Sequence, residues 1–149
     1  MSDQSSLTMS ILMTPDMANF SGNVHGGTIL KLLDQVAYAC ASRYSGTYVV
    51  TLSVDQVLFK EPIKVGEMVS FLANVNYVGR SSMEIGIRVE AQHIQSRQIR
   101  HTNSCYFTMV AVDSKGKPFE ISPLDLDSSL NKCRYEAALR RKKIRLQNN

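Results

Sequence analysis

Residues 19–44, NFSGNVHGGTILKLLDQVAYACASRY, hold the two features that decide the fold: a loop rich in Asn, Gly and Ser, and a long apolar helix. After Gly26 and Gly27 the apolar residues recur with the 3.6-residue period of a helix. The pattern predicts a helix of roughly 17 residues that is apolar around most of its circumference, is largely buried, and ends at Ser45-Gly46. Its main apolar face consists of Ile29, Leu33, Val36 and Cys40.

Downstream of this helix the chain alternates between apolar and polar residues, as β-strands do. Four strands are expected, over about residues 48–55, 71–77, 83–91 and 102–112, and residues 7–13 predict a short strand before the loop. A phase slip near Gln56 predicts a bulge, and residues 79–82 predict a hairpin. The second half of the last strand is apolar on both faces, so this strand is expected to be central in the sheet. One buried helix wrapped by one curved antiparallel sheet, an α+β fold, is the most economical arrangement.

Composition limits the classes of protein that fit. The 149 residues suit one domain, and 44% hydrophobic with 20% charged residues excludes a disordered chain. The sequence contains no run of about 18 apolar residues, so it predicts no membrane span, and the N-terminus lacks a secretory pattern. Three cysteines without a CxxC pair, with three histidines, predict neither a disulfide framework nor a metal site. We therefore expect a cytoplasmic protein.

The charge is divided unevenly along the chain. Residues 132–149 contain seven basic residues and one acidic residue, whereas residues 1–131 contain ten basic and twelve acidic ones. A predicted helix over about residues 124–146 carries the basic run. Two interpretations stay open: a solvated helix end, or a surface for an acidic partner, a nucleic acid or a cofactor phosphate. Residues 1–131 are mildly acidic, so we do not expect the body of the protein to bind nucleic acid.

Gly26, Gly27 and Asp34 are the candidates for chemistry around the helix. The two glycines at its start leave backbone N–H groups open to a negatively charged oxygen, although they also suit a simple tight turn. Asp34 lies in the third turn of the apolar helix. Shielded from solvent and ion pairs it would act as a base; alternatively, it belongs to a solvated stripe with Lys31 and Gln35.

Other polar groups have weaker or simpler interpretations. His25 fits a hydrogen-bonded structural role better than a catalytic one. Lys60 in one turn, and Arg80, Ser81 and Ser82 in another, are candidates for holding phosphates, or else ordinary polar turns. The patterns GxSxG, GxGxxG and GxxxxGK[ST] are missing, which removes serine-hydrolase elbows and the usual nucleotide loops.

Taken together, these segments resemble the hot-dog acyl-CoA thioesterases of the cytosolic acyl-CoA hydrolase type. The resemblance covers residues 7–118 and is most specific where an Asn-x-x-Gly-x-x-x-Gly-Gly loop is followed by a helical Asp. The matching segments are residues 15–19, 22–31, Asp34, 57–59, Pro62, 65–66 and 78–83. The implied organisation is a disordered leader over residues 1–6, a hot-dog domain over 7–123, and a basic helix or tail over 124–149.

The resemblance also implies a mechanism and an assembly. Acyl-CoA is hydrolysed to a carboxylic acid and coenzyme A at a dimer interface, and dimers assemble further, typically into hexamers. Asp34 would be base or nucleophile, and Asn19 of the opposite subunit would orient water or the carbonyl. Gly26 and Gly27 would face the oxyanion, and Arg80, Ser81, Ser82 and Lys60, with the basic tail behind them, would hold the coenzyme. No metal or separate cofactor is expected, because coenzyme A is part of the substrate.

Two alternatives remain from the residues alone. Hot-dog dehydratases pair a His with an acidic residue, but His25 precedes Asp34 by nine residues and no His lies one turn from Asp34. A non-catalytic acyl-CoA sensor would bind the ester without releasing thiol, and it would have no use for Asn19 and Asp34 together.

Overall fold

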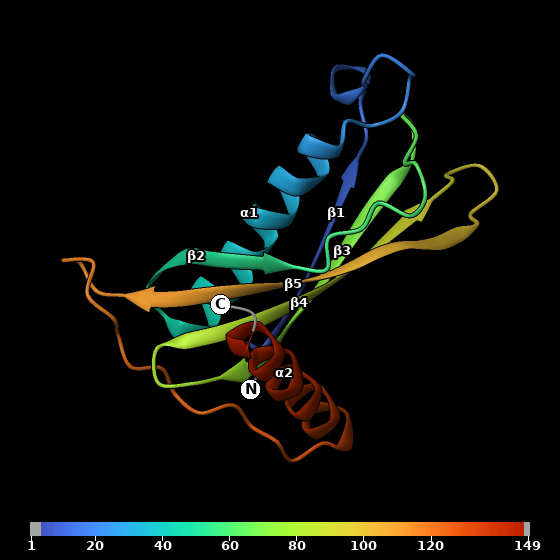
Figure 1. Cartoon of the computed structure of the whole chain (residues 1–149). Coiled ribbons are helices and arrows are strands. Elements are labelled where there is room, and N and C mark those ends of the chain that lie inside the picture. Colours follow the sequence, from blue (N-terminus) through green and yellow to red (C-terminus); the bar gives the residue numbers. More distant parts are fainter. Residues whose placement is uncertain (1–3, 148–149) are drawn as a thin grey trace.

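A five-stranded antiparallel sheet curves around one long helix in the computed structural model, which describes residues 4–147 (Figure 1). The sheet order is β1-β3-β4-β5-β2, so β1 and β2 form its two edges. This arrangement confirms the predicted α+β hot-dog fold. The strands are β1 (Ser6–Leu12), β2 (Tyr48–Asp55), β3 (Met68–Val78), β4 (Ser82–Gln92) and β5 (Ile99–Val112), and the helices are a 3-10 turn η1 (Pro15–Met17), α1 (Gly26–Ser45) and α2 (Ser129–Gln147).

Helix α1 lies on the inner face of the sheet and buries one of its own faces. The buried side chains include the apolar set that the sequence pattern predicts: Ile29, Leu33, Val36, Ala37, Cys40 and Ala41. Gly46 ends the helix with φ 75°, a left-handed conformation that favours glycine. The opposite face, with Leu30, Asp34 and Tyr38, is exposed in the single chain. The prediction of a largely buried helix therefore holds for one face only.

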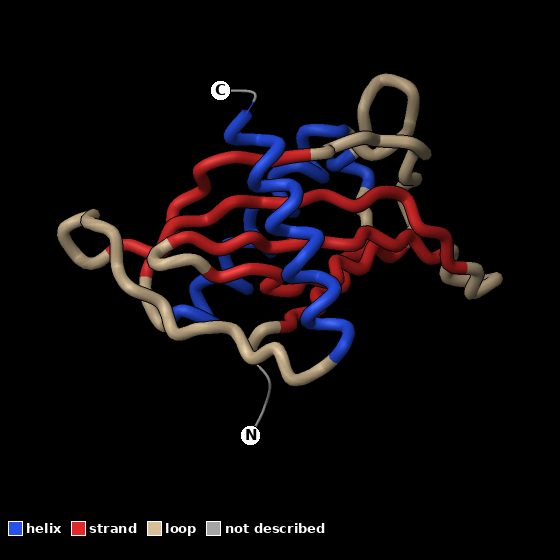
Figure 2. Tube along the Cα trace, turned by 60° about the horizontal axis from the view of Figure 1, so that its bottom comes forward, coloured by secondary structure: helices blue, strands red, loops and turns tan. Residues whose placement is uncertain are grey.

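Helix α2 crosses the other face of the sheet, so β-strands separate the two helices (Figure 2). Arg141 forms an ion pair of 2.7 Å with the buried Glu84 and stacks over the Tyr106 ring at 3.7 Å. Arg145 reaches Asp55 at 3.1 Å. Part of the charge of the basic run therefore neutralises acidic residues of the sheet. Neither the solvated helix end nor the surface for an acidic partner, the two interpretations of this run, includes these contacts. Burial raises the pKa of Glu84, and the bond to Arg141 opposes that rise.

Two local predictions are corrected. Ser6 belongs to β1, and the Ser5 carbonyl accepts a hydrogen bond from Val75 N at 2.8 Å, so these residues are not a disordered leader; residues 1–3 lie outside the described part. The bulge lies between Thr51 and Ser53, earlier than expected. The strand ends before Gln56, whose φ of 62° breaks the alternation. Within residues 4–147, no helix is long and apolar enough to cross a membrane.

Candidate active site

The loop before α1 is organised around the side chain of Asn19. Its Oδ1 accepts hydrogen bonds from Ser21 N at 2.9 Å and Ser21 Oγ at 2.7 Å, an Asx-type turn. Gly22 has φ 85°, which an L side chain rarely adopts. The loop is tied to the rest of the chain by Val24 N, which donates to Ile63 O at 2.7 Å. Asn19 is thus held in a defined position in the loop that precedes the helix.

The helix begins at Gly26, with His25 as its N-cap. His25 Nδ1 accepts a hydrogen bond of 3.0 Å from Gly27 N. The Gly27 amide thus has a partner in the single chain, and its role toward an oxyanion stays a prediction. Gly26 N–H stands at the first helical position, where the helix offers no acceptor. The structure assigns His25 the structural role, consistent with the simpler interpretation.

Asp34 lies on the exposed face of α1, beside edge strand β2. Thr51 Oγ1 donates a hydrogen bond of 2.7 Å to Asp34 Oδ1, across 17 residues of sequence. Thr51 is a residue that sequence reasoning missed. The bulge after Thr51 is the signal that could have found it, because bulges often lie next to active sites.

The remaining predicted residues lie at opposite ends of the sheet. Arg80, Ser81 and Ser82 form the β3–β4 hairpin, near the end of β5, where Ala111 N donates to Ser81 O at 2.8 Å. Lys60 belongs to the β2–β3 connection at the other end, on the side where the Asn19 loop is bridged to Lys64 through Asn23. No hydrogen bond joins Asn19 to Asp34 within residues 4–147. A single chain thus does not bring the predicted site together.

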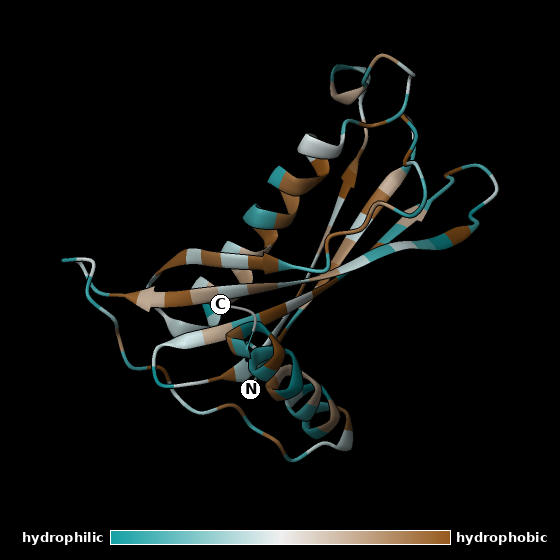
Figure 3. Cartoon of the chain, viewed as in Figure 1, coloured by the Kyte–Doolittle hydropathy of each residue, from teal (hydrophilic) through white to brown (hydrophobic). Residues whose placement is uncertain are grey.

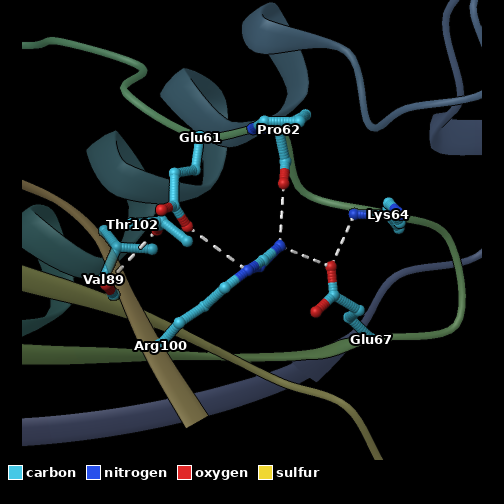
Figure 4. A network of polar contacts seen from close by, with 7 residues as sticks. All are labelled: Glu61, Pro62, Lys64, Glu67, Val89, Arg100 and Thr102. Atoms are coloured by element: carbon cyan, nitrogen blue, oxygen red, sulfur yellow. Dashed lines mark hydrogen bonds and ion pairs between the residues drawn. The ribbon is translucent and has the colours of Figure 1, made fainter.

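The connection that carries Lys60 is fixed by Arg100 of β5 (Figure 4). Arg100 Nη2 donates to Pro62 O at 2.7 Å and to Glu67 Oε1 at 2.8 Å. Arg100 Nε also forms an ion pair of 3.5 Å with Glu61 Oε2. Glu67 Oε1 also accepts from Lys64 N at 2.8 Å. These bonds hold the connection against the strand.

An apolar surface runs along the open edge of the molecule. Strand β2 pairs with β5 on one side only, and Figure 3 shows hydrophobic residues along it. Val50 and Leu52 of this strand are 51% and 68% exposed. Leu30 and Tyr38 of α1 are exposed as well, each at 41%. An unpaired strand edge with apolar side chains is a surface that another strand can cover. In the described part of the chain, no group of three or more His, Cys, Asp or Glu side chains could hold a metal.

The structure thus places the Asp34 carboxylate on the exposed face of the central helix of a hot-dog sheet, and the Gly26 N–H at the open start of the same helix. The thioesterase superfamily model matches residues 21–97, about half of the chain. The chain is 51% identical over 143 residues to Protein VdlD of Helicobacter pylori, covering 96% of this chain and 82% of the relative.

Solved structures agree with this assignment. An apo-hexameric acyl-CoA thioesterase superposes with a TM-score of 0.93 at 32% identity, covering 97% of this chain and 93% of that one. The acyl-CoA hydrolase of Staphylococcus aureus, in complex with butyryl coenzyme A, coenzyme A and coenzyme A disulfide, gives 0.86 at 30% identity, covering 97% and 91%. The chain belongs to the thioesterase superfamily, and the expected enzyme class, a thioester hydrolase, is confirmed.

Proposed function

We propose that this protein hydrolyses acyl-CoA thioesters to a carboxylic acid and coenzyme A, at a site completed by a second copy of the chain. The observation that carries the proposal is the hydrogen bond between Asp34, on the exposed face of α1, and Thr51 of the edge strand β2, whose outer side is unpaired. The S. aureus hydrolase supports it: structures exist with one Asn, one Asp or one Thr replaced by alanine. Those positions are separated by 15 and 17 residues, as Asn19, Asp34 and Thr51 are here.

Asp34 performs the first step in this proposal. The Thr51 hydroxyl engages Oδ1, so Oδ2 is the oxygen that takes a proton from water, and the resulting hydroxide attacks the thioester carbonyl carbon. If the carboxylate acts as nucleophile, the same oxygen attacks the carbonyl directly and water then cleaves the anhydride. In either route the C–S bond breaks and the thiolate leaves. Its conjugate thiol has an ordinary pKa of about 8.5, so departure needs no strong acid.

The N-terminus of α1 stabilises the negative oxygen that forms during attack. Gly26 N–H lies at the open first turn, where the helix dipole favours negative charge. Phe59 lies beside it: a Cβ atom on Gly26 would stand 3.7 Å from the ring. Phe59 is itself 51% exposed in the single chain, so this apolar ring excludes water and strengthens the hydrogen bond to the oxyanion once substrate and a second subunit cover it.

A dimer brings the separated residues together. Pairing of two β2 edges in antiparallel fashion satisfies the open backbone edge of β2 and continues the sheet. Because the strands run in opposite directions, the Arg80–Ser82 hairpin of one chain then approaches the Lys60 connection of the other. Asn19 of the partner subunit would act with Asp34, and dimers would assemble further into hexamers.

Coenzyme A phosphates fit the two turns that the dimer juxtaposes. Arg80 offers bidentate donors, Ser81 and Ser82 offer hydroxyls, and Lys60 supplies a second cation. Coenzyme A enters as part of the substrate, and the proposed mechanism uses no further cofactor. We place the activity in the cytoplasm, since three cysteines without a CxxC pair predict no disulfide framework.

The test is complementation between two inactive variants. Asp34→Ala and Asn19→Ala are each expected to lower thiol release from acyl-CoA by a hundredfold or more, with the oligomer intact. Co-expression gives mixed dimers in about half of cases, and one of the two sites in each mixed dimer takes Asp34 from the Asn19→Ala chain and Asn19 from the Asp34→Ala chain. About a quarter of all sites are therefore intact. Recovery of roughly a quarter of the wild-type rate supports the shared site.

Other outcomes reject parts of the proposal. No recovery on mixing, with mixed oligomers demonstrated by two affinity tags, places both residues in one chain and refutes the shared site. Wild-type protein that binds acyl-CoA and releases no thiol is a sensor, and the hydrolase proposal is then wrong. Each variant needs a matched folding control by circular dichroism and light scattering.

A further inference from the structure

Asn103 of β5 is a buried amide without hydrogen-bond partners. The residue is 5% exposed, and within residues 4–147 neither Oδ1 nor Nδ2 is hydrogen-bonded. An unpaired buried polar group destabilises a folded protein, and native structures satisfy most such groups. A side chain kept in this state on the core side of the sheet calls for a partner that the isolated chain lacks.

Asn103 lines two adjoining hollows. The smaller, about 10 Å³, lies between Asn103, Ile29 and Phe59, and it has room for a single water molecule. The larger, about 240 Å³, lies between Asn103, Leu58 and Lys60. Phe59, which borders the first, also lies beside Gly26. Asn103 therefore stands between the proposed oxyanion donor and the proposed phosphate-binding turn.

The walls of these hollows are held in place by polar contacts. Arg100 fixes the 60–67 segment through Pro62 O and Glu67 Oε1 (Figure 4). Thr102 Oγ1 donates to Val89 O at 3.3 Å, which ties the neighbouring residue of β5 to β4. Since both sides are anchored, the space beside Asn103 is preorganised for a ligand.

We propose that Asn103 binds an amide of the pantetheine arm of coenzyme A; this rests on the proposed function. Its side chain offers one donor group and one acceptor at the same place, and a secondary amide in the ligand satisfies both. The hydrocarbon of an acyl chain satisfies neither. No acidic residue lines the larger hollow, and Lys60 at its border suits the phosphates farther along the coenzyme.

The proposal makes Asn103 a determinant of the thiol half of the substrate. The first amide of pantetheine lies two carbons from the thioester sulfur, so it reaches a point close to the reacting carbonyl. A thioester without that amide leaves Asn103 unpaired in the complex. The enzyme then gains less from binding the thiol half, and kcat/KM falls.

The test replaces Asn103 with the isosteric apolar residue in Asn103→Leu and varies the thiol. Three esters of one acyl group are compared: those of coenzyme A, of N-acetylcysteamine, which keeps one amide, and of ethanethiol, which has none. We expect kcat/KM to fall about tenfold or more on the first two and to stay at the wild-type value on the third. Because the free enzyme loses no hydrogen bond, Tm should be unchanged or higher.

Two further variants keep the test interpretable. Asn103→Asp retains the acceptor and loses the donor, and we expect an intermediate loss on amide-bearing esters if Asn103→Leu does not fold. Thr108→Val changes a buried polar residue of the same strand that lies outside both hollows. For this variant we expect the ratio of its kcat/KM to that of the wild type to be the same for all three esters.

An equal loss on all three esters, or a marked fall in Tm, would assign Asn103 a structural role and overturn the proposal. A loss that follows the acyl group and not the thiol would also overturn it. If the wild type hydrolyses no acyl-CoA, the proposed function fails separately. Asn103 is then judged by the affinity for free pantetheine, which must weaken about tenfold in Asn103→Leu; unchanged affinity refutes the inference.

Discussion

Thr51 Oγ1 donates to Asp34 Oδ1 at 2.7 Å and thereby joins the third turn of α1 to edge strand β2. The bond leaves one carboxylate oxygen available at the surface that a second chain is proposed to cover. Thr51 touches neither substrate nor water in the proposed mechanism. It is a positioning residue, since it selects which oxygen of Asp34 faces the thioester.

Removing this bond should affect turnover more than binding. Thr51→Val keeps the shape and loses the hydroxyl, so we expect kcat for acyl-CoA hydrolysis to fall about 10- to 100-fold with KM changed less than threefold. Thr51→Ser should retain most activity because it restores the donor. Thr8→Val on the opposite edge strand β1 is the matched control. A parallel rise in KM and loss of oligomer would instead indicate a structural role.

A substitution in the Arg80 hairpin should weaken binding of substrates that carry the coenzyme A phosphates and leave substrates without them unaffected. Arg80→Ala is expected to raise KM for acyl-CoA about tenfold, because a bidentate contact with phosphate is lost. The same variant should hydrolyse acyl-pantetheine, which lacks the phosphates, at the wild-type rate. Lys115→Ala, in another surface turn, is the control for loss of one positive charge. Equal losses with both esters would contradict this assignment.

The sequence alone predicts α1 and most of the sheet because their signals are local. Residues such as Ile29 and Leu33 repeat at helical spacing, and the cap residues His25 and Gly46 bracket the observed helix. The alternation in β4 likewise specifies which side chains face the core, and Ile85 and Ile87 are both buried. Strand existence and face are encoded within a few residues.

The contacts that make the site are not local, and pattern reasoning misses them. Thr51 follows Asp34 by 17 residues, and only the packing of β2 beside α1 brings them together. The alternation around Val50 and Leu52 predicts a strand, but it does not reveal that this apolar face is exposed. The charge count of α2 likewise gives no sign that Arg141 is committed to Glu84.

The three cysteines should differ sharply in reactivity. Burial raises the pKa of the Cys105 thiol to about 12, so almost no thiolate exists at pH 8, and Cys40 is buried too. Cys133 is exposed on α2. Titration of the native protein with a disulfide reagent at pH 8 should therefore give one fast thiol per chain, lost in Cys133→Ser, and three after denaturation. Fast labelling of Cys105 would show that the sheet opens readily.

Breaking the ion pair between Glu84 and Arg141 should make the unfolding free energy of the protein depend more strongly on pH. Arg141→Met removes the group that lowers the pKa of the buried Glu84 carboxyl, so that pKa rises further above its unfolded value. A raised carboxyl pKa stabilises the fold below the unfolded pKa, and this stability is lost as pH rises through the folded pKa. We expect Arg141→Met to lose about 2–3 kcal/mol of unfolding free energy at pH 8 and clearly less at pH 5, measured by urea denaturation.

The double variant Arg141→Met with Glu84→Gln should recover much of the loss at pH 8, because it removes the buried charge. An identical loss at both pH values, without recovery in the double variant, would mean that Arg141 acts through its packing on Tyr106 alone.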